Sequence, residues 1–386
     1  MTATLMPPGN CRLCEQPLFL QPLLCQHNLP CAAQGLPTAD ELANDKGLTL
    51  ELYQCSGCGL VQLTTPPVPY WRNVIRAAGI SPEMRTFRLA QFGHWLNTYQ
   101  LTGQKILEIG CGRGEYLSLL ATAGANAYGI EHSQESVQAC RANGLSVQQA
   151  FLDDPSTHIE NGLFDGFVIL NFLEHIPTAH LTLQGIAAQL RSDAIGLVEV
   201  PNFDMIVRTG LFAEFVPDHL YYFSQKTLVT VLESNGFDVL DCRPAWHDYV
   251  LSATVRKRMP LDLSCLQVSQ QTLQNSFNSF LSAFKSKRVA VWGAGHQALA
   301  LLSLMQIAPH IRFVIDSAPF KQNRFTPATH LPIVAPRHLD GDEVDAVIVL
   351  AASYSDEVVR SIQAQYGKRF TIASLQENQL KTITIS

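Results

Sequence analysis

Two cysteine pairs with the same spacing are the first residues of this chain whose types suggest chemistry. Two residues separate Cys11 from Cys14, and two separate Cys55 from Cys58. This spacing lets a tight turn direct both sulfurs of a pair at one metal ion, and two pairs complete the closed tetrahedral site typical of structural zinc. We therefore expect a structural Zn²⁺ ion held by these four cysteines.

The stretch between the two pairs contains three further candidate ligands, Cys25, His27 and Cys31. Any of them could replace one of the four cysteines, and the sequence leaves this open. The alternative interpretation is that the cysteines are free thiols packed in a core. Six of the ten cysteines fall within the first 58 residues, and such clustering in a cytoplasmic chain favours a metal over disulfides.

A glycine turn forms the second candidate site. Gly110, Gly112 and Gly114 follow the short strand expected at Lys105–Ile109 and precede a helix. Glycines here let the backbone approach a ligand closely, and the helix N-terminus offers unpaired N–H groups. Glu131 ends the next expected strand, 17 residues after Gly114, where a carboxylate would accept both hydroxyls of a ribose. The spacing predicts a site for a nucleoside-containing cofactor.

Glu108, which lies just before this turn, distinguishes between cofactors. A dinucleotide has little use for a carboxylate at this position, whereas S-adenosylmethionine (SAM) carries an ammonium group that needs one. We therefore expect SAM as the cofactor, and an NAD-dependent oxidoreductase is the least favoured enzyme.

Alternating strands and helices must position these residues. A helix is expected at Ser81–Tyr99, and the glycine turn lies among the strands and helix expected at Lys105–Ile109, Glu115–Ala123, Ala127–Ile130, Phe164–Leu170 and Gly196–Val200. A second unit of the same kind contains elements expected at Val289–Trp292, Gln297–Met305, Arg312–Ile315 and Ala346–Leu350. The polar stretch Met259–Ser279 is interpreted as the connection between the units.

This rhythm predicts an α/β fold with three domains. They are a zinc-binding domain at residues 1–68, a class I methyltransferase Rossmann-like domain at 69–258 with an N-terminal helical segment, and a second Rossmann-like domain at 259–386.

The glycine turn with Glu108 and Glu131 resembles class I SAM-dependent methyltransferases. The segment Asn171–Pro177 resembles the loop after the fourth strand in that family, which lies beside the methionine end of SAM. The resemblance places the adenine near Phe151, Leu152 and Asp153. The full cofactor set that it implies is Glu108, Gly110, Gly112, Gly114, Glu131, Phe151, Leu152, Asp153, Asn171 and Phe172.

The order of the domains resembles the sugar C-methyltransferases, which act on nucleotide-linked keto-deoxysugars in antibiotic pathways. The matching stretches are Cys55–Gln62, Val198–Asn202, Asp218–Ser224, Val291–Gly295, Val314–Asp316 with Lys321–Gln322, and Leu331–Ile333. One stretch departs from the family: where the family has Tyr-His-Glu-His, this chain has Val216-Pro217-Asp218-His219. In the family, this Tyr and its neighbours are thought to transfer the proton of the acceptor. The departure therefore concerns which acceptor this chain methylates, and on which atom.

Transfer of a methyl group to carbon requires a base, because the carbon next to a ketone must first lose a proton. His219 is the first candidate, and a partner carboxylate at Asp218 or Glu214 would raise its basicity. His175, in the loop beside the methyl group, is the second. Tyr222 could donate a hydrogen bond to the developing oxyanion, and Tyr70 could close the site from the segment between the first two domains.

The second glycine turn, Gly293–Gly295, is followed after 21 residues by Asp316. The resemblance implies that this domain holds the nucleotide of the substrate rather than NAD. The candidate substrate-binding residues are Gly293, His296, Asp316, Lys321 and Arg324. The alternative is a degenerate fold retained for packing.

The charge of the chain argues against a nucleic-acid partner. The formal net charge is −6, and residues 1–65 carry more acidic than basic side chains. We see neither a secretory signal nor a membrane span, and we expect a cytoplasmic enzyme with a small-molecule substrate. Two alternatives stay open: an O-, N- or C-methyltransferase acting on a non-sugar natural-product intermediate, and a non-catalytic binding protein with the same fold.

Overall fold

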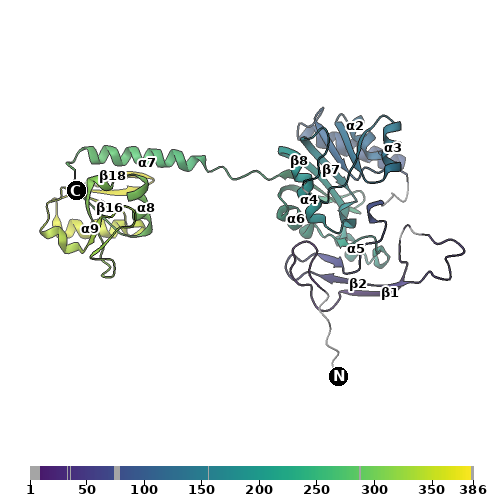
Figure 1. The fold of residues 1–386 in the computed structure, drawn as a ribbon, viewed down its shortest axis with the longest axis horizontal. Helices are drawn as coiled ribbons and strands as arrows, with labels where there is room; N and C mark the ends of the chain where they lie inside the picture. Colours follow the sequence, from purple (N-terminus) through teal and green to yellow (C-terminus); the bar gives the residue numbers. More distant parts are fainter. Residues whose placement is uncertain are drawn as a thin grey trace, which may run out of the picture. The chain divides into compact units, whose positions relative to one another are not determined.

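The computed structural model describes residues 9–32, 34, 36–73, 79–154, 156–286 and 288–383. The chain divides into two compact units, Met1–Met259 with a small and a large sheet and Pro260–Ser386 with a single sheet (Figure 1). Within the described ranges, no helix is both long and apolar enough to span a bilayer.

A small antiparallel sheet carries the cysteine-rich region, for which the sequence showed little periodicity. It contains β1 (Leu24–Leu29), β2 (Leu48–Gln54) and β3 (Val61–Leu63), and β9 (Tyr221–Tyr222) pairs with β3. The N-terminal region and the stretch after His219 therefore share one sheet, although about 160 residues separate them in the chain. Their shared core is Leu50, Leu52, Val61, Leu63, Met205, Ile206, Phe215 and Tyr222.

The large sheet of the first unit has the strand order β10-β11-β8-β7-β4-β5-β6. Its strands are β4 (Lys105–Ile109), β5 (Asn126–Glu131), β6 (Ser146–Gln149), β7 (Phe164–Leu170), β8 (Leu190–Pro201), β10 (Phe237–Ala245) and β11 (Val250–Lys257). Strands β4 to β8 are parallel, and β11 is antiparallel to β8. The strand order reverses between β4 and β7, and ligands of open α/β sheets bind at such a switch point.

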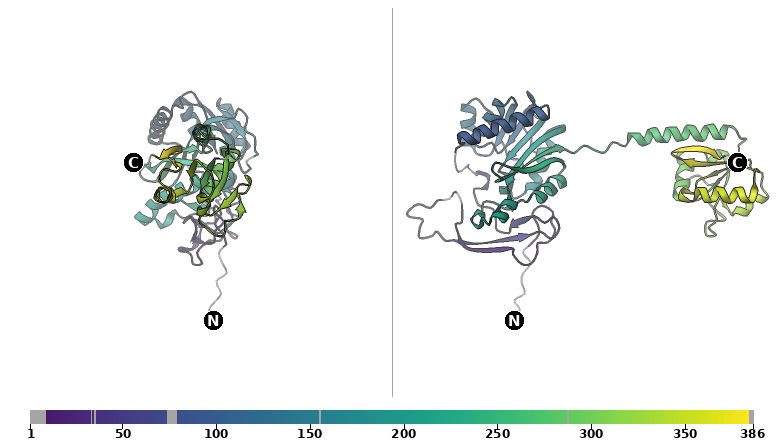
Figure 2. Two further views of the ribbon diagram at one scale, coloured as in Figure 1. Left: turned by 90° about the vertical axis from the view of Figure 1, so that its left-hand side faces the viewer. Right: turned by 180° about the vertical axis from the view of Figure 1, so that it is seen from behind.

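The helices of this unit are α1 (Pro82–Thr98), α2 (Glu115–Thr122), α3 (Gln134–Ala142), α4 (Ala179–Ala188), α5 (Phe203–Thr209) and α6 (Gln225–Ser234), with 3₁₀ turns η1 (Trp71–Asn73), η2 (Leu173–His175) and η3 (Phe212–Glu214). The expected start of α1 is confirmed, because the Ser81 side chain accepts a hydrogen bond from the Met84 N–H. Phe92, Trp95 and Leu96 pack in one buried cluster with residues of β4, β7 and β8. Figure 2 shows the helix lying along the sheet.

The second unit has the strand order β14-β15-β13-β12-β16-β17-β18. Its strands are β12 (Val289–Trp292), β13 (Ile311–Ile315), β14 (Arg324–Phe325), β15 (Pro332–Val334), β16 (Ala346–Val349), β17 (Thr371–Gln376) and β18 (Gln379–Ile383). Its helices are α7 (Ser264–Ser282), α8 (His296–Leu304) and α9 (Ser355–Tyr366), with 3₁₀ turns η4 (Ala308–His310), η5 (Pro336–Asp340) and η6 (Ala352–Tyr354).

Helix α7 corrects one expectation from the sequence. Most of the stretch interpreted as a connection is a 19-residue helix. Leu273, Phe277 and Leu281 recur every four residues, and this stripe is buried in the core of the second unit. The many Gln and Ser residues occupy the other faces, which concealed the stripe in the composition.

Candidate cofactor site and buried histidine cluster

The first glycine turn lies at the switch point of the large sheet, between β4 and α2. Gly110, Gly112 and Gly114 all have positive φ angles, of 67°, 56° and 84°, a region that favours glycine. A Cβ atom on Gly110 would lie 2.7 Å from the Phe172 ring, and one on Gly114 would lie 2.4 Å from Leu145. Side chains here would therefore disrupt both the turn and its packing.

Glu131 connects the end of β5 to this turn. One carboxylate oxygen accepts a hydrogen bond from the Gly112 N–H at 3.0 Å, and the other accepts one from the Ser133 N–H at 2.8 Å. Each carboxylate oxygen can accept further bonds. The carboxylate is therefore held in place with capacity left for a ligand's hydroxyl groups.

A cavity opens beside Glu131 and the glycine turn. Its lining residues are Arg72, Ile109, Gly110, Ile130, Glu131, His132, Ala150, Phe151, Leu152, Phe172 and Thr182. Five of the ten residues proposed for the cofactor, namely Gly110, Glu131, Phe151, Leu152 and Phe172, thus line one cavity. Aromatic rings and a held carboxylate suit an adenosine group.

Arg72 is a cavity residue that sequence reasoning missed. Its guanidinium lies 4.8 Å from the Trp71 ring centroid and 5.4 Å from that of Phe151, and it pairs with Asp153 at 2.9 Å. Asp153 therefore borders the cavity through Arg72. Phe151 and Asp153 lie about 80 residues after Arg72 in the chain, so no short sequence pattern around Arg72 indicates this contact.

The other proposed cofactor residues border the same region. Glu108 is buried near the end of β4. Asn171 follows β7 with a positive φ of 50°, and its backbone N–H donates to the Glu199 carbonyl at 2.8 Å. This strained residue turns the chain from β7 into the loop that carries Phe172 and His175.

Two family models match the chain: a methyltransferase domain over residues 83–241 and the C-methyltransferase C-terminal domain over residues 265–373. The C-methyltransferase NovU of Streptomyces niveus is 24% identical over 406 residues, which cover 95% of each chain. Together these matches identify the chain as a SAM-dependent methyltransferase.

Further similarities are local or concern the fold. A ubiquinone biosynthesis O-methyltransferase of Actinobacillus pleuropneumoniae is 32% identical over 106 residues, 25% of this chain and 44% of that protein. The SAH-bound magnesium protoporphyrin IX methyltransferase of Synechocystis PCC 6803 is 17% identical, with a TM-score of 0.37 over 48% of this chain and 92% of that one.

A cluster of Glu174, His175 and His219 lies in the methyltransferase next to the cavity residue Phe172. Their side-chain ligand atoms all lie within 4.8 Å of one another. The Glu174 and His175 side chains are almost fully buried. Burial raises the pKa of Glu174 to about 8 and lowers that of His175.

The environment of His219 differs from the expectation. The Asp218 carboxylate accepts a hydrogen bond from the Tyr70 hydroxyl at 2.7 Å, and Glu214 accepts one from Tyr249. Neither carboxylate is hydrogen-bonded to His219, whose ring instead lies 4.7 Å from that of His175. Burial, and then the charge of His175, lower the pKa of His219 to about 3. The expected increase in basicity from Asp218 or Glu214 was therefore wrong.

The Tyr222 hydroxyl, proposed to stabilise an oxyanion, is already engaged. It accepts a hydrogen bond from the Val216 N–H at 3.0 Å and donates to the Val216 carbonyl at 3.2 Å. The side chain is buried, which raises its pKa. In this arrangement Tyr222 fixes the Val216–His219 turn and has no free donor for a substrate.

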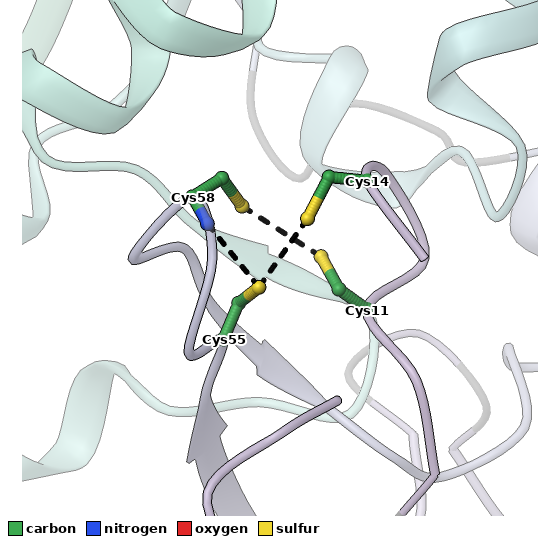
Figure 3. A group of neighbouring side chains, drawn as sticks. All are labelled: Cys11, Cys14, Cys55 and Cys58. Atoms are coloured by element: carbon green, nitrogen blue, oxygen red, sulfur yellow. Dashed lines mark hydrogen bonds between the residues drawn. The ribbon is translucent and has the colours of Figure 1, made fainter. Parts of the chain in front are cut away.

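The four paired cysteines converge, as Figure 3 shows. The Cys11 and Cys58 sulfurs lie 3.8 Å apart and those of Cys14 and Cys55 3.4 Å apart, and all four lie within 4.8 Å. The hydrogen bond with the Cys58 thiol lowers the pKa of Cys11, which favours its thiolate form. This donor set suits tetrahedral Zn²⁺.

The hydrogen bonds to the cysteine sulfurs, and the positions of the other candidate ligands, also favour a zinc site made of these four cysteines. The Gln62 side-chain amide donates to the Cys11 sulfur at 3.1 Å, and the Gly57 N–H donates to the Cys55 sulfur at 3.3 Å. Cys25, His27 and Cys31 are exposed and do not join the four-cysteine group found among the described residues.

The second glycine turn is arranged differently. Gly293 has a φ of 118°, and a Cβ atom there would lie 2.5 Å from the Leu350 carbonyl oxygen. Asp316 accepts hydrogen bonds from the Ala294 and Ala318 N–H groups and from Lys321 Nζ, at 2.8–2.9 Å. Burial alone would raise the pKa of Asp316, but Lys321 and these N–H groups lower it. The remaining candidates, His296 and Arg324, are exposed.

Proposed function

We propose that this SAM-dependent enzyme methylates a carbon atom of a nucleotide-linked keto-deoxysugar in natural-product biosynthesis in the cytoplasm. The observation that carries the proposal is the similarity to the C-methyltransferase NovU, which extends over 95% of both chains and so includes all three predicted domains. The stretches that resemble sugar C-methyltransferases support it.

The residues of the candidate cofactor site would hold SAM as follows. Glu131 accepts the ribose hydroxyls, Phe151 and Leu152 enclose the adenine, and Glu108 attracts the ammonium group. The methyl group of SAM is already activated, so orientation toward the acceptor carbon can supply much of the rate. The loop from Asn171 to His175 would place the Glu174–His175–His219 cluster beside this cofactor.

The acceptor carbon must lose a proton, and the Glu174–His175–His219 cluster is the polar group in place to assist. Tyr70 is hydrogen-bonded to Asp218 and would cover the acceptor from the segment before α1. Tyr222 supports the cluster indirectly by holding the Val216 backbone.

A structural Zn²⁺ ion at Cys11, Cys14, Cys55 and Cys58 would fix the turns at both ends of the N-terminal region. Strand β3 follows the second cysteine pair directly and pairs with β9, which begins two residues after His219. The metal would therefore stabilise the backbone that places His219.

The second unit would bind the nucleotide part of the acceptor through Gly293, His296, Asp316, Lys321 and Arg324. Lys321 neutralises Asp316 in the described arrangement, so the exposed Arg324 and the N-terminus of α8 are the groups left to attract a diphosphate.

The test is methyl transfer from labelled SAM to a panel of nucleotide-linked 4-keto sugars, with the methyl position determined by NMR. The Glu131→Ala variant is the control for label that does not depend on the cofactor site. A methyl group on a ring carbon supports the proposal.

Labelling confined to non-sugar intermediates would contradict the sugar proposal. It would favour instead an O-, N- or C-methyltransferase acting on another natural-product precursor. The Val216–His219 stretch lacks the family's Tyr and first His, and this observation favours the methylation of a non-sugar precursor as the second candidate function.

A further inference from the structure

We propose that Glu174, His175 and His219 form a second metal site, which binds one divalent cation beside the SAM cavity. This site is separate from the four-cysteine group, and its ligands come from η2 and from the turn before β9. Its existence does not depend on the identity of the acceptor.

The hydrogen bonding of His175 determines which of its nitrogens faces the cluster. Its Nδ1 atom lies 2.8 Å from the Asp218 carbonyl oxygen. A carbonyl only accepts, so Nδ1 carries the proton, and in the neutral ring Nε2 presents a lone pair. A backbone carbonyl on one imidazole nitrogen is the usual arrangement when the other nitrogen binds a metal.

That lone pair faces the Glu174 carboxylate. Nε2 of His175 lies 3.8 Å from Oε1 of Glu174, which is too long for a hydrogen bond. The second oxygen, Oε2, is buried and has no hydrogen-bond partner among the described residues. A buried carboxylate next to an imidazole lone pair is unfavourable unless a proton or a metal cation neutralises it, and two imidazoles beside the carboxylate provide the ligands for a metal.

His219 completes a set of three ligands. Its ring lies 4.7 Å from that of His175, and the ligand atoms of all three residues lie within 4.8 Å of one another. Ligands about 2.0–2.2 Å from one tetrahedral ion lie roughly 3.3–3.6 Å from one another, so the most distant pair would have to approach by about 1 Å on binding. Two imidazoles and one carboxylate suit Zn²⁺, Mn²⁺ or Fe²⁺ and leave positions open for a substrate.

An open position would accept the oxygen of a keto acceptor and stabilise the negative charge that forms when the neighbouring carbon loses its proton. This role, unlike the site itself, rests on the proposed function. It gives His219 the part of a ligand rather than of the base, and it offers a substitute for the family's Tyr that this chain lacks.

The test is metal binding to the full-length protein, purified with zinc so that the four-cysteine site stays loaded. Mn²⁺ titration is followed by electron paramagnetic resonance, and bound Zn²⁺ is counted by mass spectrometry in a second series. The wild type should bind one more ion per chain than Glu174→Gln or His219→Asn. Even loss of an outer-shell partner weakens metal binding by about 10–100-fold, so loss of a ligand should weaken it by at least about tenfold.

Two controls separate a lost ligand from a misfolded chain. His180→Asn changes a partly buried imidazole on α4 outside the cluster and should retain the extra ion. SAM affinity and melting temperature should stay near the parent values in Glu174→Gln. An equal number of ions in the wild type and both variants, with Mn²⁺ and with Zn²⁺, would overturn the proposal. No acceptor is present, so this result is independent of whether sugars are methylated.

Discussion

The two glycine turns begin from similar sequence and end as different sites. In both, a strand leads into glycines, and the acidic residue at the end of the next strand accepts a backbone N–H of the turn, Gly112 for Glu131 and Ala294 for Asp316. The two carboxylates differ in what they face besides these backbone N–H groups. Asp316 is neutralised by Lys321, whereas Glu131 faces a cavity lined by Phe151 and Phe172. The turn alone therefore does not define a cofactor site.

The sharpest test of this comparison is the pair Glu131→Ala and Asp316→Ala. Loss of Glu131 removes up to two charge-assisted hydrogen bonds to a ribose, each worth about 1.5–3 kcal/mol, so SAM affinity should fall by about 100-fold or more. Asp316→Ala should leave SAM affinity unchanged. Isothermal titration calorimetry measures both, with Glu131→Gln as a near-isosteric control. Equal losses in the two alanine variants would show that the turns do not differ in cofactor binding.

Removal of zinc tests whether the stability of the first unit, which contains the first glycine turn, depends on the four-cysteine site while that of the second unit does not. Chelation, or the Cys14→Ser variant, should release about one ion from the four-cysteine site and lower the melting temperature of the first unit, because metal binding contributes directly to folding. The unfolding of residues 260–386 should be unaffected. Calorimetry with metal analysis provides the measurement, and Cys265→Ser, an exposed cysteine of the second unit, is the matched control. Metal-replete protein that contains no zinc would refute the four-cysteine site.

Arg72→Ala tests the cavity wall that distinguishes the first turn. The variant removes the contacts with Trp71 and Phe151 and the ion pair with Asp153. Each cation–π contact at an exposed site is worth about 0.5–1 kcal/mol, so SAM affinity should fall by about tenfold. Arg72→Lys keeps the charge but not the planar group and should recover only part of it. Unchanged affinity in both variants would place Arg72 outside the cofactor site.

The smallest expected effect is that of Lys321→Ala. It removes the ion pair from Asp316 and should cost the second unit no more than about 1 kcal/mol of stability. SAM binding should stay the same. Calorimetry with UDP and adenosine provides the second measurement. If the variant bound either of them more tightly than the parent does, the ion pair of Lys321 would account for the difference between the two turns.

The sequence predicted the parts of the fold that depend on local patterns. Strands β4, β7 and β12 have the expected limits, and the cap at Ser81 is where its residue type indicated. Strands β1 to β3 were missed because their pairing depends on the turns that carry the cysteine pairs and on β9 rather than on local periodicity. Helix α7 was missed because only three buried residues define its apolar face.

By itself, the sequence determined the two cysteine pairs, both glycine turns and the acidic residues that follow them, because each depends on short spacing along the chain. Only the tertiary structure decided what surrounds them. It packed Arg72 against Phe151 and hydrogen-bonded Asp218 to Tyr70 rather than to His219. It also brought His219 into one cluster with Glu174 and His175. These contacts join residues 40 to 150 positions apart, and packing of whole strands and loops, not local preference, brings such residues together.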